Sequence, residues 1–354
     1  MNTISPSKLL LVARSWSQRG QNTDYEQFFS FFPGSINITN NNKSKFDNFI
    51  YRKLKNLANQ DGYSSLSAYL EYRTFIKSMI YRPQLIHFWF ADHDYHFSSY
   101  TANLIGAKIV GNFFFSVEEF ERRIPDKRFI KKLDLITASG RKQMDYLSNY
   151  FPKEKIIFLP LGIDTNFYCP PKKNNRFNKS TTLLHVGKNR RDFEVLKKVF
   201  LLIQKKIPSA KLELVGGKSA MTLFSDVKNV TFHPFVSDEE LLKIYQNSIL
   251  LLLPLKEGGS SQTLNEAMST GLPVVTNQLP NLEDYVLDDN SLISPKGNAE
   301  LMAKNCINIL NNKNHWELIS KKSREHSAQF DFKRVKNQII EIYKEHLDIK
   351  VIGI

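Results

Sequence analysis

The sequence predicts an α/β protein built from two doubly wound domains, each a parallel β-sheet with helices on both faces. Three observations predict this fold class. Short apolar runs alternate with longer amphipathic segments, which is typical of buried parallel strands and the helices between them. The alternation stops at a linker-like stretch, Cys169–Ser180, and then starts again. At 354 residues the chain is long enough for two domains that each bury a core.

The first half contains five runs with the length and composition of buried strands. They are Lys8–Ala13, Gln84–Phe90, Ala107–Phe115, Asp134–Ser139 and Lys155–Gly162. Helical patterns lie between them, for example over Ser64–Arg82 and Gly140–Phe151. We therefore expect a Rossmann-like N-terminal domain over residues 1–170.

A segment rich in Pro, Lys and Asn follows, and it predicts a linker over residues 171–180. Beyond it, a second Rossmann-like domain is expected over 181–332. Its strands are expected at Thr181–Gly187, Lys211–Gly217, Val230–Phe235, Ile249–Leu255 and Pro273–Asn277. Its helices are expected at Phe193–Lys206, at Asp238–Asn247, up to Thr270 and from Asn298. The last segment, 333–354, contains the amphipathic helix Lys333–Leu347 and could pack back on the N-terminal domain.

The composition is that of a globular protein with a formal net charge of +14. Such a charge suits nucleic acid, an anionic membrane surface or a phosphate-bearing substrate. Lys and Arg are spread through both halves, which argues against nucleic acid as a partner. The two cysteines, Cys169 and Cys306, have no metal or redox spacing and suggest a reducing compartment. Neither a signal peptide nor a run of about 20 apolar residues is found, so we expect a soluble, cytoplasmic protein.

The stretch Lys256–Asn277 contains the first candidate site. A glycine-serine turn follows a buried strand and precedes a helix, so free backbone N–H groups and the helix dipole would favour an anion such as phosphate. Glu266 would repel phosphate but suits the paired hydroxyls of a ribose. A purely structural interpretation competes, because Thr263–Glu266 fits a capping box and Gly271 suits the position after a helix C-terminus.

A basic turn provides the second candidate. Lys188, Arg190 and Arg191 crowd the segment between a strand that ends at Gly187 and the next helix. Cations are unfavourable at a helix N-terminus, so they indicate an anionic partner. Asp192 could meet part of that need as a helix cap. A solvated basic loop is the alternative.

Histidines cluster in the third candidate, which follows the second strand. His93 and His96 are three residues apart in a loop with Asp, Tyr and Ser. No further ligands complete a metal set, so we expect no metal, and the loop suits a hydroxyl-bearing substrate better. A polar loop without a role remains open. Phosphate-loop, dinucleotide-binding and nucleophile-elbow motifs are absent from the sequence.

Taken together, four segments resemble the GT-B glycosyltransferases of the large retaining family four. Asp134–Pro171 is similar to the family's segment that closes the first domain, with a "PxGxDxxxF"-like turn. Leu183–Leu196 resembles its phosphate turn, Phe232–Leu255 the segment that contacts the nucleotide base, and Glu257–Val275 its two-glutamate signature. The resemblance implies two domains that face each other across a cleft, with the reaction in that cleft.

Three positions depart from the family pattern. Gly258 stands where the family has its first signature glutamate, so either Glu257 or backbone amides at Gly258–Ser261 would take the contact to the donor sugar. Phe113 and Phe114 replace the family's histidine, and His93 or His96 could approach instead. The first loop holds a single glycine, Gly20, where relatives often have more.

The resemblance implies a metal-independent, retaining glycosyltransferase without a cofactor. It would move a sugar from a UDP- or GDP-sugar to a saccharide or lipid-linked saccharide, in cell-surface polysaccharide biosynthesis, as a cytoplasmic protein that could rest on the inner face of an anionic membrane. The implied catalytic residues are Lys188, Arg191, Glu257 and His93. The implied donor-binding residues are Gly187, Arg190, Pro234, Val236, Gly258, Gly259, Ser260, Ser261, Thr263, Leu264 and Glu266. Gly20 and His96 would bind the acceptor. A non-catalytic nucleotide-sugar or glycan-binding protein on the same fold is the alternative.

Overall fold

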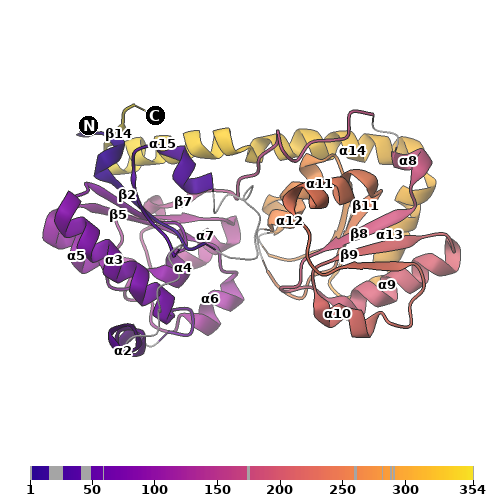
Figure 1. Cartoon of the computed structure of the whole chain (residues 1–354), viewed down its shortest axis with the longest axis horizontal. Helices are drawn as coiled ribbons and strands as arrows, with labels where there is room; N and C mark the ends of the chain where they lie inside the picture. Colours follow the sequence, from indigo (N-terminus) through magenta and orange to yellow (C-terminus); the bar gives the residue numbers. More distant parts are fainter. Residues whose placement is uncertain are drawn as a thin grey trace. The chain divides into compact units, whose positions relative to one another are not determined.

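The protein is described here by a computed structural model that covers residues 2–15, 27–40, 49–58, 60–173, 176–258, 261–280, 282–287, 289 and 292–353. The chain divides into two compact units (Figure 1). Unit 1 comprises Met1–Leu161 together with Lys333–Ile354, and unit 2 comprises Gly162–Phe332. Both units are α/β, as the sequence predicts.

Unit 1 is built on a six-stranded parallel sheet with the strand order β3-β2-β4-β5-β6-β7. Its strands are β2 (Leu9–Val12), β3 (Ile36–Ile38), β4 (Leu85–Phe88), β5 (Lys108–Phe113), β6 (Leu135–Ala138) and β7 (Ile156–Phe158). The order reverses between β2 and β4, so this sheet has a switch point of the kind at which α/β proteins bind ligands. All five predicted strands are present, and β3 lies where no strand was expected.

Seven helices belong to unit 1 in the described ranges. They are α2 (Phe49–Ala58), α3 (Ser65–Tyr81), α4 (Ala91–Asp94), α5 (Ser98–Ile105), α6 (Val117–Arg123), α7 (Arg141–Leu147) and α15 (Phe332–Leu347), the last of which begins at the unit boundary. Buried Glu71 on α3 holds the start of α5, because its carboxylate accepts hydrogen bonds from the backbone N–H groups of Phe97 and Ser98, each at 2.8 Å. Burial raises the pKa of Glu71, and the Tyr63 hydroxyl, 2.6 Å away, donates to the same carboxylate.

The two ends of the chain lie together in unit 1 (Figure 1). Strand β1 (Asn2–Ile4) pairs in parallel with β14 (Ile349–Val351). Helix α15 contacts the sheet through Tyr343, whose hydroxyl lies 2.5 Å from Nδ1 of buried His87 on β4. These contacts explain why the C-terminal segment groups with the first unit although it follows the second in the chain.

Unit 2 is built on a second six-stranded parallel sheet, with the strand order β10-β9-β8-β11-β12-β13. The strands are β8 (Thr182–Val186), β9 (Lys211–Val215), β10 (Val230–His233), β11 (Leu250–Leu253), β12 (Val274–Asn277) and β13 (Ile293–Ser294). The helices are α8 (Arg176–Lys179), α9 (Phe193–Lys206), α10 (Lys218–Leu223), α11 (Asp238–Asn247), α12 (Gln262–Ser269), α13 (Ala299–Asn311) and α14 (Lys313–Ser327). The order reverses between β8 and β11, which is the switch point of a Rossmann fold.

The division between the units differs from the expected one. Residues 162–170 and the linker segment 171–180 belong to unit 2, whereas the sequence placed the end of the first domain at 170. Backbone hydrogen bonds explain the difference, because the Ile163 N–H donates to Phe330 O at 2.8 Å and the Phe332 N–H donates to Ile163 O at 3.0 Å. The change in composition after Cys169 marks a loop, while the contacts change eight residues earlier.

Candidate functional site

The basic turn after β8 is arranged around Arg191. Gly187 ends the strand with φ +93°, a conformation that favours glycine, and Arg191 folds back so that its Nε donates to Val186 O at 2.9 Å. A Cβ on Gly187 would lie 2.8 Å from a terminal guanidinium nitrogen of Arg191. The glycine therefore makes room for the arginine at the end of β8.

The same turn is tied to the loop after β11. The Lys256 N–H donates to Arg190 O at 2.9 Å, and the Asp192 N–H donates to Pro254 O at 3.0 Å. Arg191 also forms an isolated antiparallel bridge with Leu255. These bonds join the two loops that leave the carboxyl ends of β8 and β11, which are the neighbouring strands at the switch point.

The Arg191 guanidinium stays charged in this half-buried position. Burial lowers the pKa of Arg191 to about 10, while neighbouring Tyr245 and Glu266 act in the opposite direction. At pH 7 the group is therefore almost fully protonated. Asp192 caps α9, since its carboxylate accepts from the Val195 N–H at 3.2 Å, so this acid serves the helix as the sequence suggested.

Helix α12 presents two of the expected donor-binding side chains on one face. Its N-cap is Ser261, which makes no side-chain capping bond, and the helix begins at Gln262. The capping-box interpretation of Thr263 and Glu266 is therefore wrong: Thr263 lies inside the helix. Its hydroxyl instead accepts a hydrogen bond from the Arg191 guanidinium at 3.1 Å. The helix therefore meets the basic turn through this bond.

Glu266 lies one turn further along α12 and is buried. Its Oε2 accepts a hydrogen bond from the hydroxyl of Tyr245 on α11 at 2.8 Å. Burial, and then the nearby Glu266 charge, raise the pKa values of both Tyr245 and Tyr168. Two phenols that stay protonated thus surround the carboxylate and help to stabilise its charge.

The other end of α12 is fixed by Gly271. Its φ is +68°, its N–H donates to Met268 O at 2.9 Å, and the Leu272 N–H donates to Ala267 O at 2.9 Å. The expectation that Gly271 follows the helix C-terminus is confirmed. Buried Arg176 satisfies the Thr270 and Gly271 carbonyls at 2.9 and 3.2 Å.

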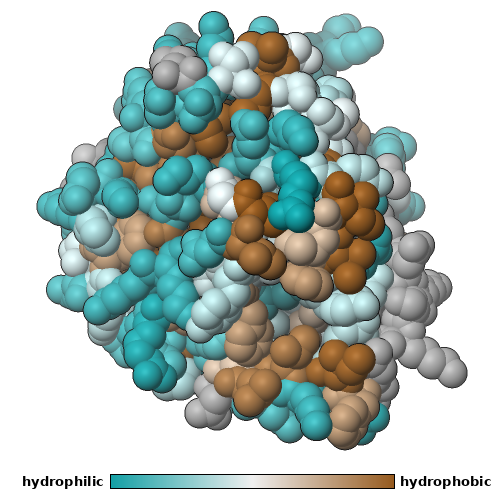
Figure 2. Space-filling view, turned by 90° about the vertical axis from the view of Figure 1, so that its left-hand side faces the viewer, coloured by the Kyte–Doolittle hydropathy of each residue, from teal (hydrophilic) through white to brown (hydrophobic). Residues whose placement is uncertain are grey.

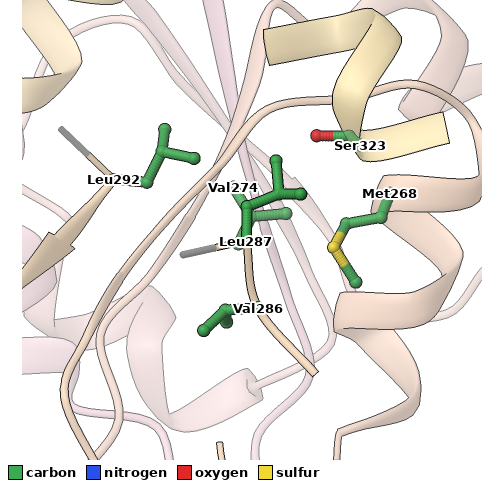
Figure 3. Close-up of a pocket in the computed structure, with 6 residues that line it drawn as sticks. All are labelled: Met268, Val274, Val286, Leu287, Leu292 and Ser323. Carbon is green, nitrogen blue, oxygen red and sulfur yellow. The ribbon is translucent and has the colours of Figure 1, made fainter. Parts of the chain in front are cut away.

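A small cavity behind α12 is apolar and belongs to the packing of this helix. Figure 3 shows Met268 of α12 facing a group of aliphatic side chains, with the Ser323 hydroxyl of α14 nearby. The lining residues are Met268, Val274, Val286, Leu287, Leu292 and Ser323. Its volume of about 10 Å³ holds at most one water. The cavity therefore cannot bind a sugar nucleotide.

The remaining expected donor residues have varied positions. Gly258 is buried with φ +135°, and a Cβ there would lie 3.4 Å from Cδ of Arg190, itself at φ +61°. Glu257 is half-buried and Lys188 exposed, next to the same loops. Pro234 is exposed and Val236 half-buried in the turn after β10; Leu264 is buried in α12. Gly259 and Ser260 lie outside the described residues.

The first unit places its two expected histidines in different surroundings. His93 is half-buried on α4, just beyond the carboxyl end of β4, with its ring 4.5 Å from that of Phe115. His96 packs among Tyr63, Phe97 and Phe129, and burial lowers its pKa to about 4. Gly20 lies outside the described residues. His93 is thus the less enclosed of the two in its ring contacts, with Phe90 and Phe115 as its ring neighbours.

Sequence reasoning missed two residues that organise the candidate site around α12 and the loop after β11. Tyr245 lies in an ordinary amphipathic helix pattern, and only the fold brings it to Glu266. Asn277 closes β12, where its Oδ1 accepts the Leu255 N–H at 2.7 Å and its Nδ2 donates to Leu255 O at 3.2 Å. The position of Asn277 at the end of a predicted strand was a weak signal for its role. The sequence contains no signal for the role of Tyr245.

Two general features concern the part of the chain that the structure describes. No group of three or more His, Cys, Asp or Glu side chains there is arranged to hold a metal ion. No helix in those same ranges has the length and hydropathy required to cross a bilayer.

Part of the chain is similar in sequence to known glycosyltransferases. Residues 180–312 match the family described as glycosyl transferases group 1. An uncharacterised glycosyltransferase of Haemophilus influenzae is 28% identical over 176 residues, which cover 47% of this chain and 49% of that protein. The sulfoquinovosyl transferase of Arabidopsis thaliana is 25% identical over 197 residues, 50% of this chain and 38% of the relative. The chain thus matches these curated relatives over half of their length or less.

Solved structures resemble the chain over nearly its whole length. The sucrose-phosphate synthase of Thermosynechococcus elongatus has a TM-score of 0.69 at 17% identity, over 96% of this chain and 89% of that one. The Anabaena protein Alr3699/HepE, in complex with UDP and glucose, has a TM-score of 0.68 at 13% identity, over 96% and 99%. The chain therefore has the GT-B fold of these proteins, and its residues 180–312 match the model of the glycosyl transferases group 1 family.

Proposed function

We propose that the protein is a glycosyltransferase that moves a sugar from a nucleotide-diphosphate-sugar to a hydroxyl of a saccharide or lipid-linked saccharide. One observation carries the proposal. Arg191 is held at the carboxyl end of β8 and bonded to Thr263 on α12, one turn from buried Glu266. A fixed cation and a buried carboxylate at the switch point suit a ligand with a diphosphate and a pair of hydroxyls.

In this proposal the donor binds to unit 2. Arg191 and Lys188, with the backbone amides of Ser261–Leu264 at the start of α12, would stabilise the charge that develops on the leaving diphosphate. Glu266 would accept hydrogen bonds from the ribose. The turn with Pro234 and Val236 would contact the base. Gly187 and Gly258 keep space beside the two arginines, Arg191 and Arg190.

The sugar and acceptor roles follow from the resemblance. Glu257 and Gly258–Ser260 would orient the donor sugar. Unit 1 would bind the acceptor, with His93 as the candidate beside the reacting hydroxyl and Gly20 and His96 as further acceptor contacts. We propose transfer with retention of configuration and without a metal, in cell-surface polysaccharide biosynthesis. A UDP-sugar is the first donor to test, because the Anabaena relative was solved with UDP-glucose.

We also propose that the protein is cytoplasmic and rests on an anionic membrane surface. The net charge of +14 supports this part of the proposal. A non-catalytic nucleotide-sugar-binding protein is the second candidate. It is favoured by a single observation, Gly258 at the position of the first signature glutamate.

The decisive experiment combines donor binding with turnover. UDP-, GDP- and ADP-sugars are screened by thermal shift, where a ligand at about 100 times its Kd stabilises by roughly 2.7 kcal/mol. The donor that binds is then tested for transfer and slow hydrolysis. Arg191→Lys should lower turnover by about tenfold or more, because a loss of roughly 1.4 kcal/mol in transition-state binding has that effect. Glu266→Gln should instead raise the KM for the donor by about tenfold or more, because the group that would hold the ribose loses its charge.

Matched controls make the same two exchanges at exposed positions. Arg128→Lys and Glu300→Gln change side chains that are 88% and 65% exposed, and turnover and the donor KM should stay at the wild-type values. If a nucleotide-sugar binds but is neither transferred nor hydrolysed, the protein is the non-catalytic nucleotide-sugar-binding protein and not the enzyme. Equal loss in the site variants and the controls would contradict the assignment of the site.

A further inference from the structure

Helix α3 of unit 1 exposes an unusual surface. Surface helices normally turn polar residues to the solvent. On α3, every exposed residue is apolar or aromatic, and all of them lie between Tyr72 and the C-terminal end of the helix. They are Tyr72, Phe75, Ile76, Ile80 and Tyr81. Tyr72, Ile76 and Ile80 are four residues apart, and Phe75 lies beside them, so these four share one side of the helix, while Tyr81 lies at its C-terminal end.

Two neighbouring helices extend this surface. Tyr100 and Leu104 of α5 are 63% and 66% exposed, and α3 packs against α5. Phe49, Ile50 and Leu57 of α2 are also exposed, and Tyr51 of α2 contacts Tyr69 and Tyr72 of α3 by their rings. Together the three helices carry ten of the fifteen large exposed hydrophobic side chains in the described part of the chain. Figure 2 views the molecule from the left-hand side of Figure 1, where α5 lies, and shows hydrophobic patches between hydrophilic ones.

Cations accompany the apolar side chains, and exposed acids do not. The three helices carry Arg52, Lys53, Lys55, Arg73 and Lys77, while their one acidic residue, Glu71, is buried and hydrogen-bonded. Lys77 lies 4.9 Å from the centre of the Tyr81 ring, and Lys53 lies 4.5 Å from that of Phe49. Long cationic side chains beside aromatic rings are typical of protein surfaces at a membrane interface.

We infer that the exposed face of α2, α3 and α5, termed here the α3 face, docks on an anionic lipid bilayer. Its apolar side chains would enter the boundary between headgroups and acyl chains, and its cations would meet the anionic headgroups. A protein partner would have to be acidic as well as apolar to match this face, whereas an anionic bilayer supplies both chemistries at once. This inference deepens the membrane part of the proposed function, but it rests on the α3 face alone.

The first test is sedimentation of the full chain with vesicles. Vesicles of phosphatidylcholine with about 30% phosphatidylglycerol should bind at least tenfold more protein than phosphatidylcholine alone, because each Lys or Arg near an anionic surface adds to binding. Raising the salt concentration should weaken vesicle binding without abolishing it, because salt screens the charges but not the apolar contact. Equal sedimentation with both vesicle types, or none with either, overturns the inference.

Variants then assign the binding to the α3 face. Phe75→Glu with Ile80→Glu places acids on positions that are 41% and 65% exposed, and vesicle binding should fall by about tenfold or more. The matched control, Leu201→Glu with Leu318→Glu, introduces the same two charges at positions of unit 2 that are 40% and 50% exposed. If the control loses as much binding as the α3-face variant, net charge explains the result and the inference is wrong.

Two further measurements separate other outcomes. Light scattering of the wild type and the α3-face variant shows whether this face joins two copies of the chain. If the wild type is a dimer, the variant is a monomer and neither binds vesicles, the partner of the α3 face is a second copy and the bilayer inference is wrong. Donor binding by thermal shift is measured on the same samples. Vesicle binding without any nucleotide-sugar binding would remove the proposed transferase and leave the docking inference standing. Wild-type circular dichroism of the variant excludes misfolding.

Discussion

Tyr245 and Glu266 form a buried hydrogen bond between α11 and α12, 2.8 Å from the phenol to Oε2. The bond holds the carboxylate that we assign to the ribose. Tyr245→Phe should raise the KM for the donor by about three- to tenfold, since a single hydrogen bond contributes roughly 0.5–1.5 kcal/mol. The turnover number should change less, because the ribose is remote from the reacting bond.

A second buried tyrosine provides the control. Tyr343 also loses one hydroxyl contact, to His87, when it is replaced by Phe, and it lies in unit 1. Both variants should lose similar thermal stability. Only Tyr245→Phe should change the donor KM; an equal KM for the two variants would show that Tyr245 is merely structural.

Thr263→Val tests the contact that joins α12 to the basic turn. Valine keeps the shape of threonine but cannot accept the Arg191 hydrogen bond, which measures 3.1 Å. The guanidinium should lose part of its fixed orientation, and the turnover number should fall by about threefold to tenfold. Thr270→Val on the same helix is the control, because that hydroxyl donates to Ala267 O and has no contact with Arg191 in the described structure. Similar rates for the two variants would contradict the role of Thr263.

Much of the fold could be predicted because local signals agreed. The helices over Phe193–Lys206 and Asp238–Asn247 have the bounds that were expected from their apolar spacing and caps. Strands β3 and β13 were missed, because two or three residues at the edge of a sheet give too short a pattern. The pairing of β1 with β14 was also missed, since a contact between the two chain ends leaves no trace in local sequence.

The candidate site divides in the same way. Gly187 and the cations after β8 are close in sequence, so their proximity in the structure could be predicted. The bonds from Arg191 to Thr263 and from Tyr245 to Glu266 join residues 72 and 21 positions apart, and only the sheet topology brings them together. His96 was predicted to contact a substrate because it lies in a polar segment, but its side chain packs among aromatic rings. Burial depends on neighbours from other segments, which the local sequence does not reveal.

Acid should destabilise unit 1 through His87. Burial lowers the pKa of His87 from 6.5 to about 3, so the unfolded chain binds a proton there below pH 6.5 while the folded chain does not. The stability contributed by the neutral ring is present above pH 6.5 and is lost as the pH falls toward 3. At pH 4 the loss should be about 3 kcal/mol. Urea unfolding between pH 4 and 7 measures it.

His87→Asn should remove this part of the pH dependence, because an amide retains a polar group near the Tyr343 hydroxyl and does not titrate. His346→Asn is the control, an exposed histidine on the same helix as Tyr343. The slope of stability against pH should decrease in the first variant and stay unchanged in the second. The same slope in all three proteins would show that other groups cause the acid sensitivity.

Gly187→Ala should disturb the donor site beyond its effect on the backbone. An alanine at φ +93° is strained by about 1–2 kcal/mol, and its Cβ would lie 2.8 Å from an Arg191 guanidinium nitrogen, which must therefore move. Gly297 has φ +79° with no atom within 4 Å of a built Cβ, so Gly297→Ala carries the strain without the collision. Both variants should lose stability in urea unfolding, and Gly187→Ala should lose at least as much as Gly297→Ala because the collision adds to the strain. Turnover should fall by about tenfold or more in Gly187→Ala alone, because only there does the guanidinium leave the end of β8; equal turnover in the two variants would mean that the position of Arg191 does not matter for transfer.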